Sequence, residues 1–74
     1  MRTQEAIEAI CTAKNYRSSR VSCARFTLKQ YCSESELIYL IERESGLSVS
    51  KGFYSKKALV EILALVCEIN NLGV

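Results

Sequence analysis

Proline and glycine, the residues that most often interrupt regular structure, are scarce in this chain. Its 74 residues include no Pro and only three Gly, at Gly46, Gly52 and Gly73. A fold made of many short strands needs frequent turns, and turns draw heavily on these two residue types. The sequence therefore predicts long helical segments joined by few loops.

Apolar residues recur at helical spacing in four segments. In the second of these, Val21, Ala24 and Leu28 fall on one face of a helix. At the start of the third, Ser33 precedes Glu36 by three positions, which is the capping-box pattern of a helix N-terminus. We expect helices over about residues 3–14, 18–31, 34–45 and 55–70.

The segment between the last two expected helices has a different pattern. Residues 47–54 begin with an apolar and polar alternation at Leu47 and Val49, which indicates an extended loop or one short strand. Hydrophobic residues make up 49% of the chain, which is enough for a packed core, and the length allows one domain. We therefore predict a single all-α domain over residues 1–74, a compact bundle of four short helices.

The last expected helix is apolar on most of its circumference. Only Lys57, Glu61 and Glu68 form a polar stripe along it. Such a helix must be surrounded by other groups, and a chain of this size buries only about 60% of its unfolded surface. The sequence therefore predicts a homo-oligomer, with a dimer favoured, or a larger protein partner.

Phe26 lies opposite the apolar stripe of the second expected helix, so it either meets a partner or is exposed. Exposed aromatic residues are frequent anchors of protein interfaces. The residues that we predict at a protein interface are Phe26, Leu63, Val66 and Ile69.

Composition argues against an enzyme. The chain has no His, so the usual general base near neutral pH and the commonest metal ligand are missing. The acidic pairs Glu34/Glu36 and Glu42/Glu44 cannot converge on one substrate or ion, because residues two apart on a helix point about 200° away from each other. We predict no catalytic residues and no cofactor.

The four cysteines show no metal-binding pattern. They stand at Cys11, Cys23, Cys32 and Cys67, and no two have the C-x-x-C spacing of a chelating or redox pair. A zinc site made from four distant thiolates is the minor alternative. Because free Cys is commonly buried, we predict reduced thiols that serve as small core residues and bind no metal.

The N-terminal segment and the apolar runs indicate a cytoplasmic protein. Glu5 and Glu8 stand where a signal peptide has its uninterrupted apolar stretch. The longest apolar run, residues 62–67, is far shorter than the ~20 residues of a membrane-spanning helix. We expect no association with a membrane.

Positive charge is concentrated in the first half of the chain. Residues 1–31 contain six Lys or Arg and only two Glu, although the net charge of the whole chain is only +2. This segment can contact phosphates or an acidic partner, or it can simply keep the second helix soluble. The candidate contact residues are Lys14, Arg17, Arg20, Arg25 and Lys29.

The order of elements over residues 33–66 resembles the helix-extension-helix of SAP and LEM modules. The matching features are Gly46-Leu47 and Ser55-Lys56-Lys57-Ala58-Leu59. The resemblance implies binding to DNA or to a DNA-associated protein, but the highly apolar final helix departs from the amphipathic helix of those modules.

Two function classes follow. The leading hypothesis is a small, non-enzymatic intracellular regulator, adaptor or inhibitor that acts by protein–protein interaction and self-associates. The alternative is a small DNA- or RNA-binding regulator that uses the basic segment 14–29.

Overall fold

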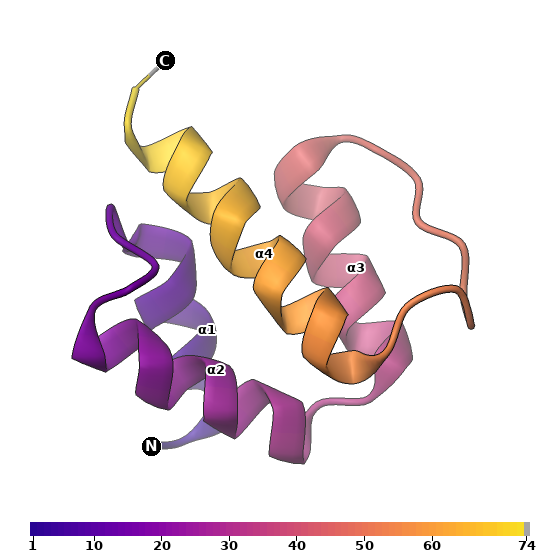
Figure 1. Ribbon diagram of the computed structural model, residues 1–74, viewed down its shortest axis with the longest axis horizontal. Helices are drawn as coiled ribbons and strands as arrows, with labels where there is room; N and C mark the ends of the chain where they lie inside the picture. The colour runs from indigo at the N-terminus through magenta and orange to yellow at the C-terminus, as the bar shows by residue number, and fades with distance from the viewer. Residues whose placement is uncertain (74) are drawn as a thin grey trace.

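Four helices account for most of the chain, as the scarcity of Pro and Gly predicts. The computed structural model describes residues 1–73 and contains no strand among them. The prediction of an all-α bundle is confirmed. The helices, in chain order, are α1 (Thr3–Thr12), α2 (Ser19–Tyr31), α3 (Glu34–Ser45) and α4 (Lys56–Asn71) (Figure 1).

Serine side chains begin three of the four helices. Ser18, Ser33 and Ser55 each accept a hydrogen bond from the backbone N–H three residues later, at 3.1–3.3 Å. At α3 the Glu36 carboxylate also accepts a hydrogen bond from the Ser33 N–H, at 3.1 Å, which completes the predicted capping box and lowers the pKa of Glu36. Gly46, with φ of +74°, ends α3 where the sequence indicates.

The first helix is shorter than expected. It ends at Thr12 because Ala13 adopts an extended conformation, with φ of −73° and ψ of 144°. The chain then turns at Asn15, whose backbone carbonyl accepts a hydrogen bond from the Ser18 N–H at 3.1 Å. This turn leads directly to the cap of α2.

The 47–54 segment is an irregular loop held against α3 by two carboxylates. Glu42 accepts a hydrogen bond from the Val49 N–H at 2.8 Å, and Glu34 accepts one from the Gly52 N–H at 2.7 Å. These two bonds give the backbone N–H groups of the loop the acceptors that a neighbouring strand would otherwise provide. The path of the loop is therefore fixed without a sheet.

Helix α4 occupies the centre of the bundle. It packs against each of the other three helices, whereas α1 and α3 lie on either side of it and have few contacts with each other (Figure 1). Leu59, Leu63 and Cys67 of α4 have no exposed surface. The fold therefore depends on one helix against which the other three pack.

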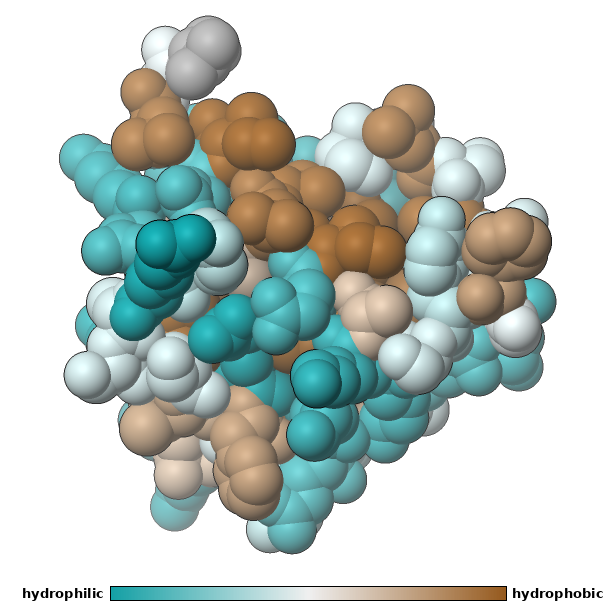
Figure 2. Space-filling model, in the orientation of Figure 1, coloured by the Kyte–Doolittle hydropathy of each residue, from teal (hydrophilic) through white to brown (hydrophobic). Residues whose placement is uncertain are grey.

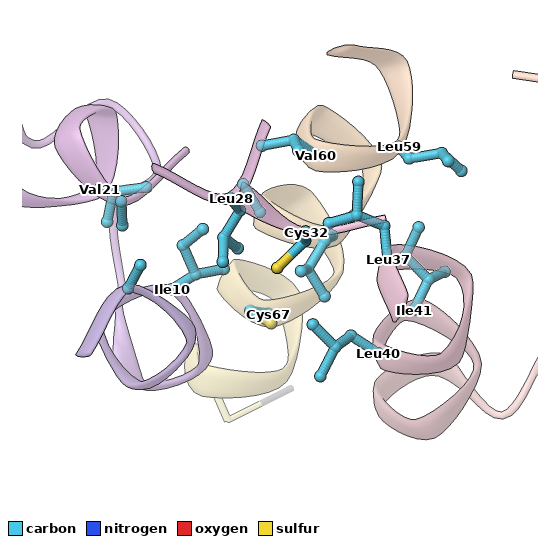
Figure 3. Packing of buried hydrophobic residues seen from close by; sticks show 14 of the residues in the cluster. Ile10, Val21, Leu28, Cys32, Leu37, Leu40, Ile41, Leu59, Val60 and Cys67 are labelled. Atoms are coloured by element: carbon cyan, nitrogen blue, oxygen red, sulfur yellow. The ribbon is translucent and has the colours of Figure 1, made fainter. Parts of the chain in front are cut away.

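The hydrophobic core is a single cluster with contributions from all four helices. In the close view of this cluster, the thiols of Cys32 and Cys67 lie between Ile10 on one side and Leu37 and Ile41 on the other (Figure 3). Burial raises the pKa of Cys32, which keeps its thiol protonated. Cys32 is thus a small core residue, as the sequence predicts.

The capping box of α3 gives a direct stability test. Ser33→Ala removes the side-chain acceptor for the Glu36 N–H, so we expect the free energy of unfolding to fall by about 0.5–2 kcal/mol in a urea titration followed by circular dichroism. Ser35→Ala, at an exposed position inside α3, is the matched control and should cost nothing. Equal losses in the two variants would contradict the assignment of the cap.

Candidate functional site

One side of α4 faces solvent and carries no charge. Ile62, Leu65, Val66 and Ile69 fill an arc of about 100° when the helix is projected at 100° per residue. Leu65 is 42% exposed and Ile69 is 60% exposed, while Ile62 and Val66 are half-buried beside them. We call these four residues the α4 apolar face, and Figure 2 shows apolar surface running along the C-terminal half of α4.

A groove of about 330 Å³ continues this face toward the α3–α4 loop. Ile62 and Val66 form its helical side, and Leu47, Phe53 and Tyr54 of the loop line the opposite side. The rings of Phe53 and Tyr54 meet edge to face, with centroids 5.1 Å apart. Helix and loop together present a concave apolar surface rather than a single exposed side chain.

The charged residues of α4 explain why the apolar side faces outward. Glu61 forms an ion pair with Arg25 of α2 at 3.1 Å, and the Glu68 carboxylate accepts a hydrogen bond from the Tyr16 N–H at 3.2 Å. Two of the three residues of the predicted polar stripe, Glu61 and Glu68, therefore contact α2 and the loop before it, while Lys57 is exposed. The arc of Ile62, Leu65, Val66 and Ile69 also faces solvent.

The structure separates the predicted interface residues. Val66 and Ile69 belong to the α4 apolar face, and Phe26 is 63% exposed on α2, where it borders a smaller recess with Lys29. The prediction of Leu63 at the interface is wrong, because this residue has no exposed surface and packs among the other helices in the core. It offers nothing to a partner.

Sequence reasoning overlooked Leu65 and the loop residues Leu47 and Phe53. The signal for Leu65 was available, since it lies on the same side of the helix as Ile69. This position of Leu65 indicates an exposed apolar face only when Glu61 and Glu68 are known to contact other parts of the chain.

The contrast between Leu63 and Leu65 can be measured. We expect Leu63→Ala to lower the free energy of unfolding by about 2–5 kcal/mol, because it leaves a cavity in the core. Leu65→Ala, two positions along the same helix, should cost less than about 1 kcal/mol. Denaturant titration of both variants checks this, and similar costs would place Leu65 in the core as well.

The basic residues do not gather into one patch. Arg25 is held by Glu61, and the guanidinium groups of Arg17 and Arg25 lie 5.5 and 5.8 Å from the centre of the Tyr16 ring. Arg25 thus connects Tyr16 of the α1–α2 loop to α2, whereas Arg17 lies in that loop and is exposed.

The other three candidate cations are exposed, as Arg17 is, and they border two different recesses. Lys14 and Arg20 border one recess beside Ser18, whereas Lys29 borders the recess next to Phe26. Arg20 and Lys29 are nine residues apart on α2, which places them on opposite sides of the helix. A phosphate backbone following one groove would not meet all of them.

The acidic residues of α3 each have a separate role. Glu34 and Glu42 hold the loop, Glu36 caps the helix, and Glu44 lies against Cys67. Within each of the pairs Glu34/Glu36 and Glu42/Glu44, the two carboxylates contact different groups.

The one group of metal-ligating side chains found among residues 1–73 combines two cysteines with a carboxylate. The sulfur atoms of Cys11 and Cys67 and a carboxylate oxygen of Glu44 all lie within 4.8 Å of one another. A hydrogen bond with the Cys67 thiol lowers the pKa of Cys11, and the same bond together with burial raises the pKa of Cys67. Sequence spacing gives no sign of this group, because its members are separated by more than twenty residues.

Comparison with protein-family models, curated proteins and solved structures finds no match to this chain. The helix–loop–helix order of residues 33–66 is present in the structure, but no match to a SAP or LEM family supports the resemblance. In the part of the chain that the structure describes, every helix is too short or too polar to cross a membrane.

Proposed function

We propose that this protein is a small, non-enzymatic regulator, adaptor or inhibitor that acts by binding another protein through the α4 apolar face and the adjoining groove. The observation that supports this proposal is the uncharged, exposed arc of Ile62, Leu65, Val66 and Ile69 on the central helix. The proposal places the protein in the cytoplasm, where thiols stay reduced.

An exposed apolar surface of this kind is typical of interfaces. Single exposed hydrophobic residues are ordinary, but a contiguous apolar patch marks a binding surface. Here the arc is joined to the aromatic residues Phe53 and Tyr54, and aromatic side chains supply a large share of binding energy in protein interfaces. Polar groups that could specify a small ligand are limited, in the groove, to serine and tyrosine hydroxyls and backbone groups.

A second copy of the chain is the partner that this face fits most simply. A twofold interface places the same patch of both copies in contact, which suits a surface without charge because no like charges oppose each other there. The net charge of +2 per chain adds little repulsion between copies. A larger protein with a complementary apolar surface can occupy the same site.

Ile69→Asp tests this assignment without disturbing the core. Ile69 is largely exposed in the single chain, so the variant should keep its helical circular dichroism. In a dimer the new carboxylate would be buried without a partner, and we expect the dissociation constant for self-association to rise at least about tenfold. Light scattering coupled to size exclusion, over a range of protein concentrations, measures the shift.

Tyr39→Asp is the control for that experiment. Tyr39 is equally exposed, but it lies on α3 and borders a recess that shares no residue with the α4 groove. It should leave self-association unchanged. A wild-type protein that is monomeric at all concentrations would refute the dimer, and equal effects of both variants would refute the role of the α4 apolar face.

Nucleic-acid binding is the second candidate, and one observation favours it. Lys14 and Arg20 lie at one recess with Ser18, so cationic and hydroxyl groups face the same space. Even with the exposed Arg17 of the same loop, these cations neutralise only a few phosphates, and affinity for duplex DNA depends mainly on that number.

We therefore expect weak binding to generic duplex DNA, with a dissociation constant of about 10⁻⁴ to 10⁻⁶ M at about 150 mM salt. Fluorescence anisotropy with a labelled duplex measures it. Tight binding that Arg20→Ala weakens, with the slope of log affinity against log salt reduced by about 0.9, would make nucleic-acid binding the correct function.

A further inference from the structure

Three helices each contribute one ligand-type atom to a single point beside the core. Cys11 comes from the end of α1, Glu44 from the end of α3, and Cys67 from the last turns of α4. Cys67 Sγ lies 3.9 Å from Glu44 Oε1, and the three ligand atoms are all within 4.8 Å of one another. Nothing in the protein–protein function proposed above uses this cluster.

The spacing of these atoms is close to that of a tetrahedral zinc site. With Zn–S bonds of about 2.3 Å and a Zn–O bond of about 2.0–2.2 Å, tetrahedral geometry holds the two sulfurs about 3.8 Å apart and each sulfur about 3.6 Å from the oxygen. Closing the observed cluster to these values requires movements of about 1 Å or less. Side-chain rotation at the ends of three helices can supply such movements.

The charges around the cluster suit a divalent cation. Two thiolates and one carboxylate carry three negative charges, which a divalent ion reduces to one. Arg43 balances that remaining charge, because its Nη2 lies 4.0 Å from Cys11 Sγ and its Nε lies 3.5 Å from Glu44 Oε2. Soft thiolate ligands favour Zn²⁺ over Mg²⁺ or Ca²⁺, which prefer oxygen.

The metal-free cluster is electrostatically unfavourable in its fully ionised form. The Cys67 sulfur lies 3.9 Å from Glu44 Oε1, and the Cys11 sulfur lies within 4.8 Å of both atoms, so like charges would face one another at short range. The charged groups facing this pair are Glu44 and Arg43, both from α3. A bound divalent cation would offset this repulsion.

The backbone around the cluster is also fixed by hydrogen bonds. The Asn71 side chain donates to the Cys11 carbonyl at 2.6 Å, and the Asn70 side chain donates to the Glu44 carbonyl at 2.8 Å. The two asparagines thus tie the ends of α1 and α3 to α4. Such outer contacts orient metal ligands, and Cys11 is half-exposed, which leaves a path for an ion from solvent.

From this geometry we propose that Cys11, Glu44 and Cys67 form a binding site for one Zn²⁺ ion, with water as the fourth ligand. The proposal differs from the expectation that cysteine spacing gives, namely thiols that bind no metal. It would link α1 directly to α3, the two helices that otherwise have few contacts.

Titration of the reduced, metal-free protein with Co²⁺ tests the site. Co²⁺ replaces Zn²⁺ in thiolate sites and makes thiolate coordination visible as charge-transfer absorption. We expect one Co²⁺ per chain, displacement by Zn²⁺, a higher melting temperature with Zn²⁺, and weaker binding as the pH falls because both thiols must lose their protons.

Three variants identify the ligands while circular dichroism confirms that each is folded. Cys11→Ser changes a half-buried residue and should weaken Zn²⁺ binding by more than about a hundredfold. The loss of a group that only hydrogen-bonds to a metal ligand already lowers metal affinity by about 10–100-fold. Glu44→Gln should weaken it by at least about tenfold. Cys23→Ser, at an exposed position on α2 outside the cluster, should have no effect.

Two results would overturn the proposal. One is Co²⁺ binding that is absent, or that persists unchanged in Cys11→Ser. The other is a wild-type protein that takes up no metal under reducing conditions and then forms a Cys11–Cys67 disulfide on exposure to air. That result would assign the pair to redox chemistry instead.

Discussion

Burial of the α4 face that carries Leu59, Leu63 and Cys67 is the contact on which the rest of the structure depends. All three side chains are fully buried, and each of the other helices packs against α4 rather than forming a separate layer. A chain this short has little apolar area to spare, so one central helix shared by three neighbours uses that area efficiently. As a consequence, α4 must be apolar over a wide arc.

That requirement connects the fold to the proposed function. Glu61 and Glu68 contact Arg25 and Tyr16, and the solvent-facing arc of Ile62, Leu65, Val66 and Ile69 contains no polar residue. The inner side of the helix provides stability, and its outer side, together with the loop groove, provides the surface on which the interaction hypothesis rests.

Local signals in the sequence were sufficient for the helices. Ser33 with Glu36 marks the start of α3 and Gly46 marks its end, because capping depends on residues within one turn of each other. The early end of α1 was not predictable, since it depends on the extended conformation of Ala13 and not on a Pro or Gly.

The surface features were harder to predict because they depend on distant residues. No residue near Glu61 in the sequence indicates that its carboxylate forms an ion pair with Arg25, on another helix. In the same way, Cys11 and Cys67 are far apart along the chain and meet only through the packing of α1 on α4. Spacing rules for metal sites describe ligands on one turn or one loop, and this group has none of those patterns.

The loop beside the groove has a consequence for how such a protein can diversify. Glu34 and Glu42 hold it through the backbone amides of Gly52 and Val49, so the anchoring bonds do not depend on the loop side chains. Residues such as Leu47 and Phe53 can therefore be exchanged at little cost in stability, while the path of the loop is kept. Substitutions at these positions would change the shape and polarity of the groove surface while the fold is kept, so this surface and the fold can vary largely independently.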